Sequence, residues 1–168
     1  YAANGVQLGI ARSDASFASV GATRNQRSVA AAAEQLGAGN PVYESILRSD
    51  SAATAQSGFQ QLSGEIYPAI GTMLINDSRQ VRDAVGERLR HTPVTGESNV
   101  WVKALGSWGK TDSRSDTAGY TSSLGGMLAG VDGALDEQTR VGLVAGYSDS
   151  SLTMGSGTHS SASVDSYH

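Results

Sequence analysis

Histidines are the residues of this sequence best suited to acid–base chemistry, and they stand at His91, His159 and His168. With the many Ser and Asp residues of the chain, they could in principle form a Ser-His-Asp triad for acyl transfer. A nucleophilic serine usually sits in a Gly-x-Ser-x-Gly turn between a strand and a helix, and no such turn occurs in that setting here. We therefore predict no catalytic residues and expect that this chain is not itself an enzyme.

Phosphate and metal sites also lack the residues that they require. Gly125-Gly126 with Gly130 resembles a nucleotide loop, but no Lys-Ser/Thr pair and no helix follow it. The sequence has no Cys, and its His residues are isolated, so no set of metal ligands is apparent. We predict no cofactor and no metal. The net charge of −4 gives no reason to expect nucleic-acid binding.

The arginines near residues 79–90 are the most suggestive charged groups. One interpretation is a solvated helix with an Arg79–Asp83 pair at i,i+4 spacing. The other is a helix inside a pore whose wall is acidic, because residues 91–168 carry four Lys/Arg and eight Asp/Glu. The residues alone leave both interpretations open. The candidate contacts between helix and pore are Arg79, Arg82, Arg88, Asp132 and Lys103.

The first half of the chain has the composition of helices. An alternating pattern predicts a short strand within residues 5–12, and residues 15–90 are then rich in helix-forming residues. Gly37 to Pro41 should separate two helices, and Pro68 should kink a later helix or begin a new one. The last piece, residues 76–90, is polar around most of its circumference. Glu65 and Tyr67 have no obvious catalytic partner, and we interpret them as packing residues, with Glu65 near a cap or an ion pair.

After His91 the hydrophobic period changes from 3.6 to 2, which indicates strands. Long, short and long polar stretches separate the candidate strands, as loops and turns do in an up-and-down membrane barrel. The four predicted strands are Val100–Trp108, Gly125–Leu135, Arg140–Ser148 and Ala162–Tyr167.

The two faces of these strands differ in character. One face is apolar and ends in aromatic residues, while the other carries Lys103, Asp132 and Arg140, and Leu128 breaks the pattern. A barrel wall with lipid outside gives this pattern, and so does a soluble sheet with its apolar face inward. Periodicity alone favours the soluble sheet. In the barrel interpretation the lipid-facing residues are Met127, Val131, Val141, Leu143 and Tyr147.

Several segments resemble one known family when they are taken in order. The segments 99–109, 125–132 and 140–148 look like the first three strands of the autotransporter β-domain, and 165–168 looks like the opening of the fourth. Upstream, residues 23–30 are similar to the entry into the family's helical linker, and Leu62-Ser63-Gly64-Glu65-Ile66-Tyr67 is similar to its most recognisable linker motif. The similarity covers almost all of residues 20–168.

The resemblance implies an α+β fragment, in which a helical linker precedes the first antiparallel strands of a transmembrane β-barrel. The full-length protein would then have a twelve-stranded barrel in the bacterial outer membrane, with a helix through its lumen. We expect residues 1–14 to end the passenger, 15–92 to form the linker with the lumen helix at 76–90, and 93–168 to begin the barrel. The chain starts at Tyr1 and stops at His168 inside a predicted strand, so we expect both ends to lie within a longer protein.

The implied function is translocation and anchoring, in which the chain supports the export and surface display of an N-terminal passenger by type V secretion. The expected partners are outer-membrane lipid, the chain's own passenger and the barrel-insertion machinery, and open strand edges could also pair with another copy. Two alternatives remain open: a soluble helical junction or folding module of the passenger, and a fragment of a protein whose upstream passenger is a hydrolase, either a protease or an esterase.

Overall fold

The structure is a computed structural model that describes residues 14–91, 98–155 and 160–168. The chain divides into two compact units at the boundary between Ser63 and Gly64. This boundary falls inside the 15–92 segment that we expected to be one linker. The strand predicted within residues 5–12 lies outside the described residues. None of the described helices is long and apolar enough to cross a membrane.

The first unit is a group of four helices, whose bounds are α1 Phe17–Val20, α2 Arg24–Gln35, α3 Pro41–Leu47 and α4 Ala52–Leu62. Each helix begins at a polar residue whose side chain accepts a backbone N–H of the first turn. These caps are Ser16, Thr23, Asn40 and Ser51. Pro41 begins α3 as expected, because a missing N–H costs nothing at the first helical position.

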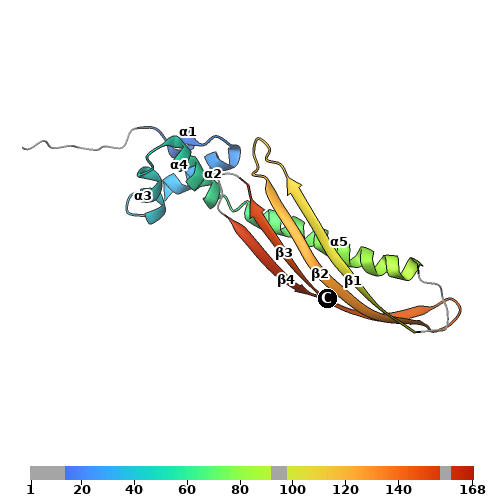
Figure 1. The fold of residues 1–168 in the computed structure, drawn as a ribbon. Coiled ribbons are helices and arrows are strands. Elements are labelled where there is room, and N and C mark those ends of the chain that lie inside the picture. The colour runs from blue at the N-terminus through green and yellow to red at the C-terminus, as the bar shows by residue number, and fades with distance from the viewer. Residues whose placement is uncertain (1–13, 92–97, 156–159) are drawn as a thin grey trace, which may run out of the picture. The chain divides into compact units, whose positions relative to one another are not determined.

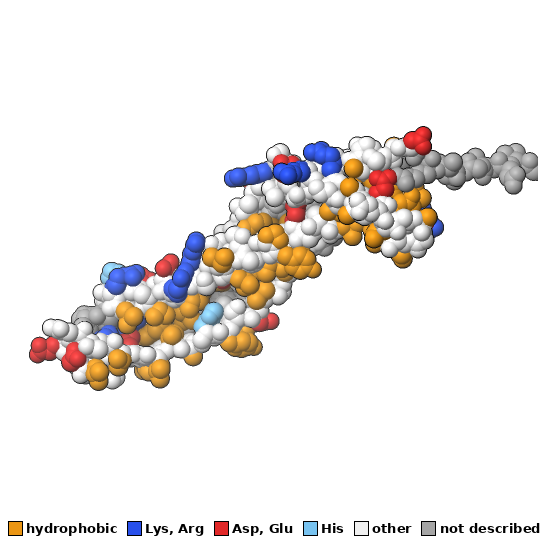
Figure 2. All heavy atoms as spheres, turned by 180° about the vertical axis from the view of Figure 1, so that it is seen from behind, with side chains coloured by type: hydrophobic (Ala, Val, Ile, Leu, Met, Phe, Trp, Pro, Cys, Tyr) orange, Lys and Arg blue, Asp and Glu red, His pale blue; other side chains and the backbone are white. Residues whose placement is uncertain are grey.

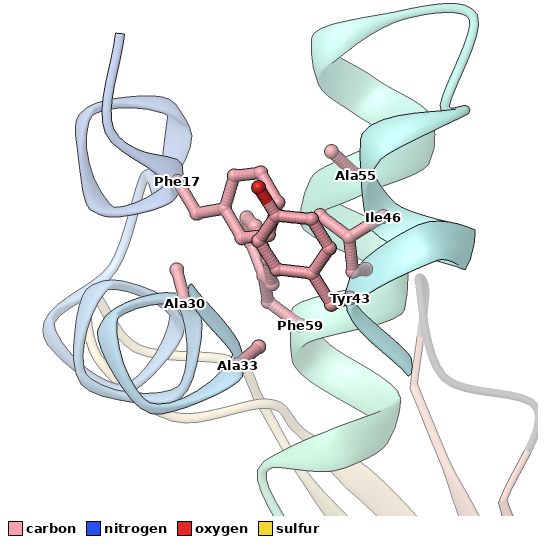
Figure 3. Packing of buried hydrophobic residues seen from close by; sticks show 7 residues of the cluster. All are labelled: Phe17, Ala30, Ala33, Tyr43, Ile46, Ala55 and Phe59. Carbon is pink, nitrogen blue, oxygen red and sulfur yellow. The ribbon is translucent and has the colours of Figure 1, made fainter. Parts of the chain in front are cut away.

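Aromatic rings and alanines form the core of this unit (Figure 3). Phe59 is fully buried, and the rings of Phe17 and Tyr43 lie 5.1 Å apart between their centroids. Ala30 and Ala33 on α2 leave room for these rings to approach the helix. The unit therefore has its own hydrophobic core, separate from that of the strands.

The second unit begins with one long helix, α5, which spans Ile66–His91. Gly64 separates α4 from α5 and has φ of 67°, a left-handed conformation that glycine adopts without steric cost. Pro68 lies in the first turn of α5, so it begins a new helix and does not kink an existing one. The helix that we expected at 76–90 is therefore longer, because residues 66–75 continue it without a break.

Four antiparallel strands complete the second unit in the order β1-β2-β3-β4 (Figure 1). Each strand pairs with the next in sequence, so Ala104, Met127, Tyr147 and Tyr167 stand in one row across the sheet. The strands are β1 Asn99–Thr111, β2 Tyr120–Ala134, β3 Arg140–Met154 and β4 Ser161–Tyr167. The architecture confirms the predicted fold class, a helical part followed by antiparallel strands.

Most strands are longer than the sequence predicted. β2 begins at Tyr120 and β3 continues to Met154, so polar segments that we assigned to loops are paired strands. Backbone pairing satisfies the N–H and C=O groups whatever the side chains are, so a polar surface does not end a strand. The turn between β2 and β3 is short, and Asp136 accepts hydrogen bonds there from the backbone N–H groups of Gln138 and Thr139. The bond from Gln138 is the main reason that the pKa of Asp136 lies below its usual value.

Candidate functional site

Helix α5 lies along one face of the sheet and contacts all four strands (Figure 1). Near its beginning, Ala69 and Met73 pack with Leu152 and Met154 of β3. In its second half, Ala84 packs with a second apolar cluster on β1 and β2. The strand residues of this second cluster are Leu105, Leu124, Leu128 and, less deeply buried, Trp101. The helix is therefore seated on the sheet over most of its length.

Leu128 explains why the alternating pattern of β2 seemed to fail. It lies on the same face as Gly126 and Gly130, and it is completely buried under α5. The period of two is therefore intact, because an apolar residue on this face has an apolar stripe of a helix to contact. The glycines beside Leu128 have no side chains and so leave space for neighbouring residues. A Cβ on Gly130 would meet the Trp101 ring at 2.5 Å.

Asp132 of β2 joins the end of α5 to the sheet. Arg88 of the helix donates from Nε to Oδ2 at 2.8 Å and from Nη2 to Oδ1 at 3.3 Å. Arg140 of β3 donates from Nε to Oδ1 of the same carboxylate at 2.9 Å. Only 3% of the Asp132 side chain and 5% of the Arg140 side chain are exposed, against 27% for Arg88. A buried carboxylate held by two guanidinium groups makes a stronger contact than an exposed ion pair.

A second ion pair of opposite polarity lies beside the first. Glu87 on α5 pairs with Lys103 on β1, and the two side chains are 57% and 39% exposed. The neighbouring residues Glu87 and Arg88 thus reach two different strands with opposite charges, which defines the rotation of the helix on the sheet. Sequence analysis did not single out Glu87. Its position next to Arg88 is the signal that could have found it. Consecutive residues on a helix point about 100° apart, so Glu87 and Arg88 are directed toward different strands.

Arg79 and Arg82 do not take part in this arrangement. Arg79 reaches only Asn76 on its own helix, at 3.5 Å from Nη1 to Oδ1. Within the described part of the chain, neither arginine forms an ion pair, and the Arg79–Asp83 pair of the solvated-helix interpretation is also absent. Both side chains lie on exposed positions of α5. Of the three candidate arginines, the structure brings Arg88 alone to Asp132.

The opposite face of the sheet is apolar and uncovered. Leu143 is 78% exposed, and neighbouring large apolar side chains on this face are also exposed. In the view of Figure 2, hydrophobic side chains gather in a band along the unit that holds α5 and the sheet. The five predicted lipid-facing residues all lie on this face and are at least 41% exposed: Met127, Val131, Val141, Leu143 and Tyr147. A soluble sheet would place this apolar face inward, whereas here the helix covers the more polar face.

The strands of this sheet match a known family. Residues 100–168 match the family model described as the autotransporter β-domain. Residues 100–168 of this chain belong to the autotransporter family. Two proteins named extracellular serine protease, both from Serratia marcescens, are similar to it, at 34% identity over all of this chain and at 30% identity over 92% of it. No solved structure matches the chain.

The family match gives the sheet an outer-membrane context. Autotransporter β-domains are outer-membrane proteins of Gram-negative bacteria, and residues 100–168 form part of such a translocator domain. The chain spans about a fifth of the length of the relatives that it matches, since the aligned regions cover 21% and 20% of those proteins.

The described residues do not form the histidine-based catalytic or metal sites that we considered from the sequence. Ser148 Oγ lies 3.0 Å from His168 Nε2, which is the spacing of a nucleophile and its base. A triad also needs a carboxylate bonded to the histidine, and among the described residues His168 has none, while Asp165 lies on the other face of the sheet and bonds to Tyr147. His91 ends α5, and His159 lies outside the described residues. No group of three potential metal ligands occurs among the residues that the structure describes.

Proposed function

We propose that residues 64–168 anchor an exported passenger in the outer membrane, with α5 in the lumen of the β-domain. The observation that carries this proposal is the inverted sheet, which exposes its apolar face and covers the other face with a helix. Each large apolar side chain left in water costs about 1.5–3 kcal/mol relative to burial. Lipid removes that cost, and a helix in the lumen contacts the inward face.

The direction of α5 supports a passenger outside the cell. Its beginning lies with Tyr120 and Met154, at the end of the sheet that carries the β1–β2 loop. Its last turn lies with Asp132 and Arg140, at the end that carries the short β2–β3 turn. In outer-membrane barrels the longer loops are extracellular and the short turns periplasmic. Residues that precede α5 would then emerge on the extracellular side.

A charge placed on the proposed lipid face tests the membrane assignment. Leu143→Arg in the full-length protein should lower its abundance in the outer membrane and the surface display of its passenger, because arginine near the bilayer midplane costs about 2–4 kcal/mol. Ser151→Arg is the matched control, since Ser151 faces the same way on β3 beyond Tyr147. Protease accessibility of the passenger on intact cells measures display. Equal display by both variants would contradict the proposal.

We also infer that the whole protein carries a serine-protease passenger upstream of this chain. The relatives named extracellular serine protease, which align with all or nearly all of the chain, support this inference. The chain itself would then be the non-catalytic part of an enzyme. Full-length protein secreted from cells should cleave a casein substrate, and a serine-directed inhibitor should abolish the cleavage. Secreted passenger without such activity would contradict the inference and leave the anchoring role intact.

A second candidate role concerns residues 14–63. Their separate core and four capped helices favour a junction module that folds as its own unit. The outer edges of β1 and β4 have no pairing partner among the described residues, so we expect further strands or another copy there, and insertion by the barrel-insertion machinery.

A further inference from the structure

Glu65, in the segment that resembles the family's linker motif, makes a contact that sequence analysis did not predict. Its Oε2 accepts a hydrogen bond of 2.8 Å from the backbone N–H of Ala118. Glu65 precedes the first residue of α5, and Ala118 lies in the loop between β1 and β2. The contact thus joins the beginning of the helix to the loop at the proposed extracellular end. From the sequence we expected a packing residue near a cap or an ion pair.

The loop around Ala118 is itself ordered by its own hydrogen bonds. Arg114 and Thr117 form an isolated antiparallel bridge, and Gly119 donates from its backbone N–H to Ser113 Oγ at 2.9 Å. Ala118 and Ile66 both pack against the apolar cluster under the first turns of α5. A single carboxylate at Ala118 is therefore linked to the rest of the loop through the contacts of the neighbouring residues.

The two polar contacts at the ends of α5 match in spacing. Glu65 and Arg88 are 23 residues apart, which is about 34 Å along a helix. Their partners are Asp132 on β2 and Ala118, which lies two residues before β2 begins at Tyr120. The 12 residues from Tyr120 to Asp132 span about 40 Å of strand, or about 30 Å along the barrel axis at a tilt of about 40°, and the two loop residues add a few Å. Both contacts therefore form together in one register of the helix, and a shift by one turn, about 5.4 Å, breaks them.

We propose that Glu65 is a positioning residue that closes the β1–β2 loop over the outer end of the lumen when α5 reaches its final register. This inference rests on the proposed place of α5 in the lumen. Arg88 on Asp132 fixes the inner end of the helix, and Glu65 then meets the loop at the outer end. While the chain is still moving through the pore, Glu65 is not level with Ala118 and the loop stays free.

The closing experiment uses the full-length protein in intact cells with a cysteine at position 118. Residues 1–168 contain no Cys, so Ala118→Cys supplies a single thiol within this segment and retains the backbone N–H. Glu65→Ala should raise the labelling rate by a membrane-impermeant maleimide about tenfold, the ratio expected for the loss of a hydrogen bond to a charged group. Glu65→Gln keeps an acceptor and should raise it less. Glu137→Ala, which removes an exposed carboxylate from the β2–β3 turn, should leave it unchanged.

A shortened helix tests the spacing. Deleting residues 76–79 removes about one turn of α5, so the two contacts can no longer form together, and labelling at position 118 should rise as in Glu65→Ala. A labelling rate in Glu65→Ala or in the deletion variant equal to that of the unaltered protein would overturn the proposal.

A separate cysteine pair reports whether α5 is seated at all. Glu87→Cys and Lys103→Cys replace one ion pair and leave Arg88 on Asp132, so a short thiol cross-linker should join the two positions. If the two positions cross-link but Glu65→Ala leaves the labelling rate at position 118 unchanged, the loop closure is contradicted and the lumen position of α5 is not. If the protein with only these two substitutions does not cross-link, both the proposed lumen position of the helix and the loop closure are contradicted.

Discussion

The two ion pairs that hold the last turn of α5 differ in how deeply they are buried. Glu87 and Lys103 are exposed, so their pair contributes about 0–1 kcal/mol, as surface pairs usually do. Asp132 is buried and accepts from Arg88 and Arg140, so the loss of either partner leaves a charge short of its hydrogen bonds. The helix is held at this end mainly by one carboxylate.

Replacement of Arg88 should therefore weaken the protein more than replacement of a neighbouring arginine. Arg88→Gln should lower the free energy of unfolding of the full-length protein by about 1–3 kcal/mol, since Arg140 still partners Asp132. Arg82→Gln should change it by less than about 0.5 kcal/mol, because Arg82 is exposed. Urea unfolding of the refolded protein in detergent measures both. Equal losses would show that general positive charge, and not the Asp132 contact, holds the helix.

The sequence predicts that arginines of α5 pair with an acidic residue of the sheet, but it does not predict which arginine does so. A period of two placed Asp132 on the inner face, and the acidic half of the chain suggested arginine partners. Three arginines on a polar helix were equivalent candidates, because the rotation of α5 depends on where its narrow apolar stripe packs. The choice of Arg88, and the second bond from Arg140, depend on that packing and on the register between β2 and β3.

Contacts between α5 and the sheet determine which apolar residues of the second unit are buried. The alternating pattern of a single strand does not reveal these contacts. Leu128 looked like an interruption of the strand pattern, yet it is the most buried residue beneath α5. The helix that covers it lies about forty residues earlier in the sequence, so no local pattern could reveal the contact. Strand ends were underestimated for a related reason, because antiparallel neighbours extend one another through backbone hydrogen bonds.

Two adjacent residues of β2 provide a test of these faces. Leu128→Ala should cost about 2–5 kcal/mol of stability, because it leaves a cavity beneath α5. Met127→Ala, on the outer face, should cost about 1 kcal/mol or less, since lipid fills the space. Thermal unfolding in lipid vesicles, followed by heat-modifiable migration on gels, distinguishes the two variants. A larger loss for Met127→Ala would reverse the faces.

The whole molecule combines two units with different cores. Residues 14–63 pack around Phe59, as an ordinary soluble protein would, whereas the strands leave their apolar face open. From the sequence, the change of hydrophobic period at His91 located the boundary between helices and strands. It could not show that α5 belongs with the strands, since that depends on contacts between segments far apart in the chain.

The two units should lose structure independently. Phe59→Ala in the full-length protein should destabilise residues 14–63 by about 3–5 kcal/mol, because the ring is fully buried. Hydrogen–deuterium exchange should then rise in α1 to α4 and stay unchanged in β1 to β4. Tyr67→Ala, at a 75% exposed position, is the control and should change exchange in neither set. Faster exchange throughout the strands of Phe59→Ala would show that the two cores are coupled.

The most direct test of the central claim is a nitroxide scan of positions 140–148 in the full-length protein in outer-membrane lipid. Oxygen concentrates in hydrocarbon and a charged nickel chelate stays in water, so each site reports its surroundings. We expect high oxygen accessibility at 141, 143, 145 and 147, and low values at the even positions between them, which share the face that α5 covers and that we place in the lumen. Chelate accessibility at 143 with oxygen maxima at the even positions would contradict the outward apolar face and the place of α5 that follows from it.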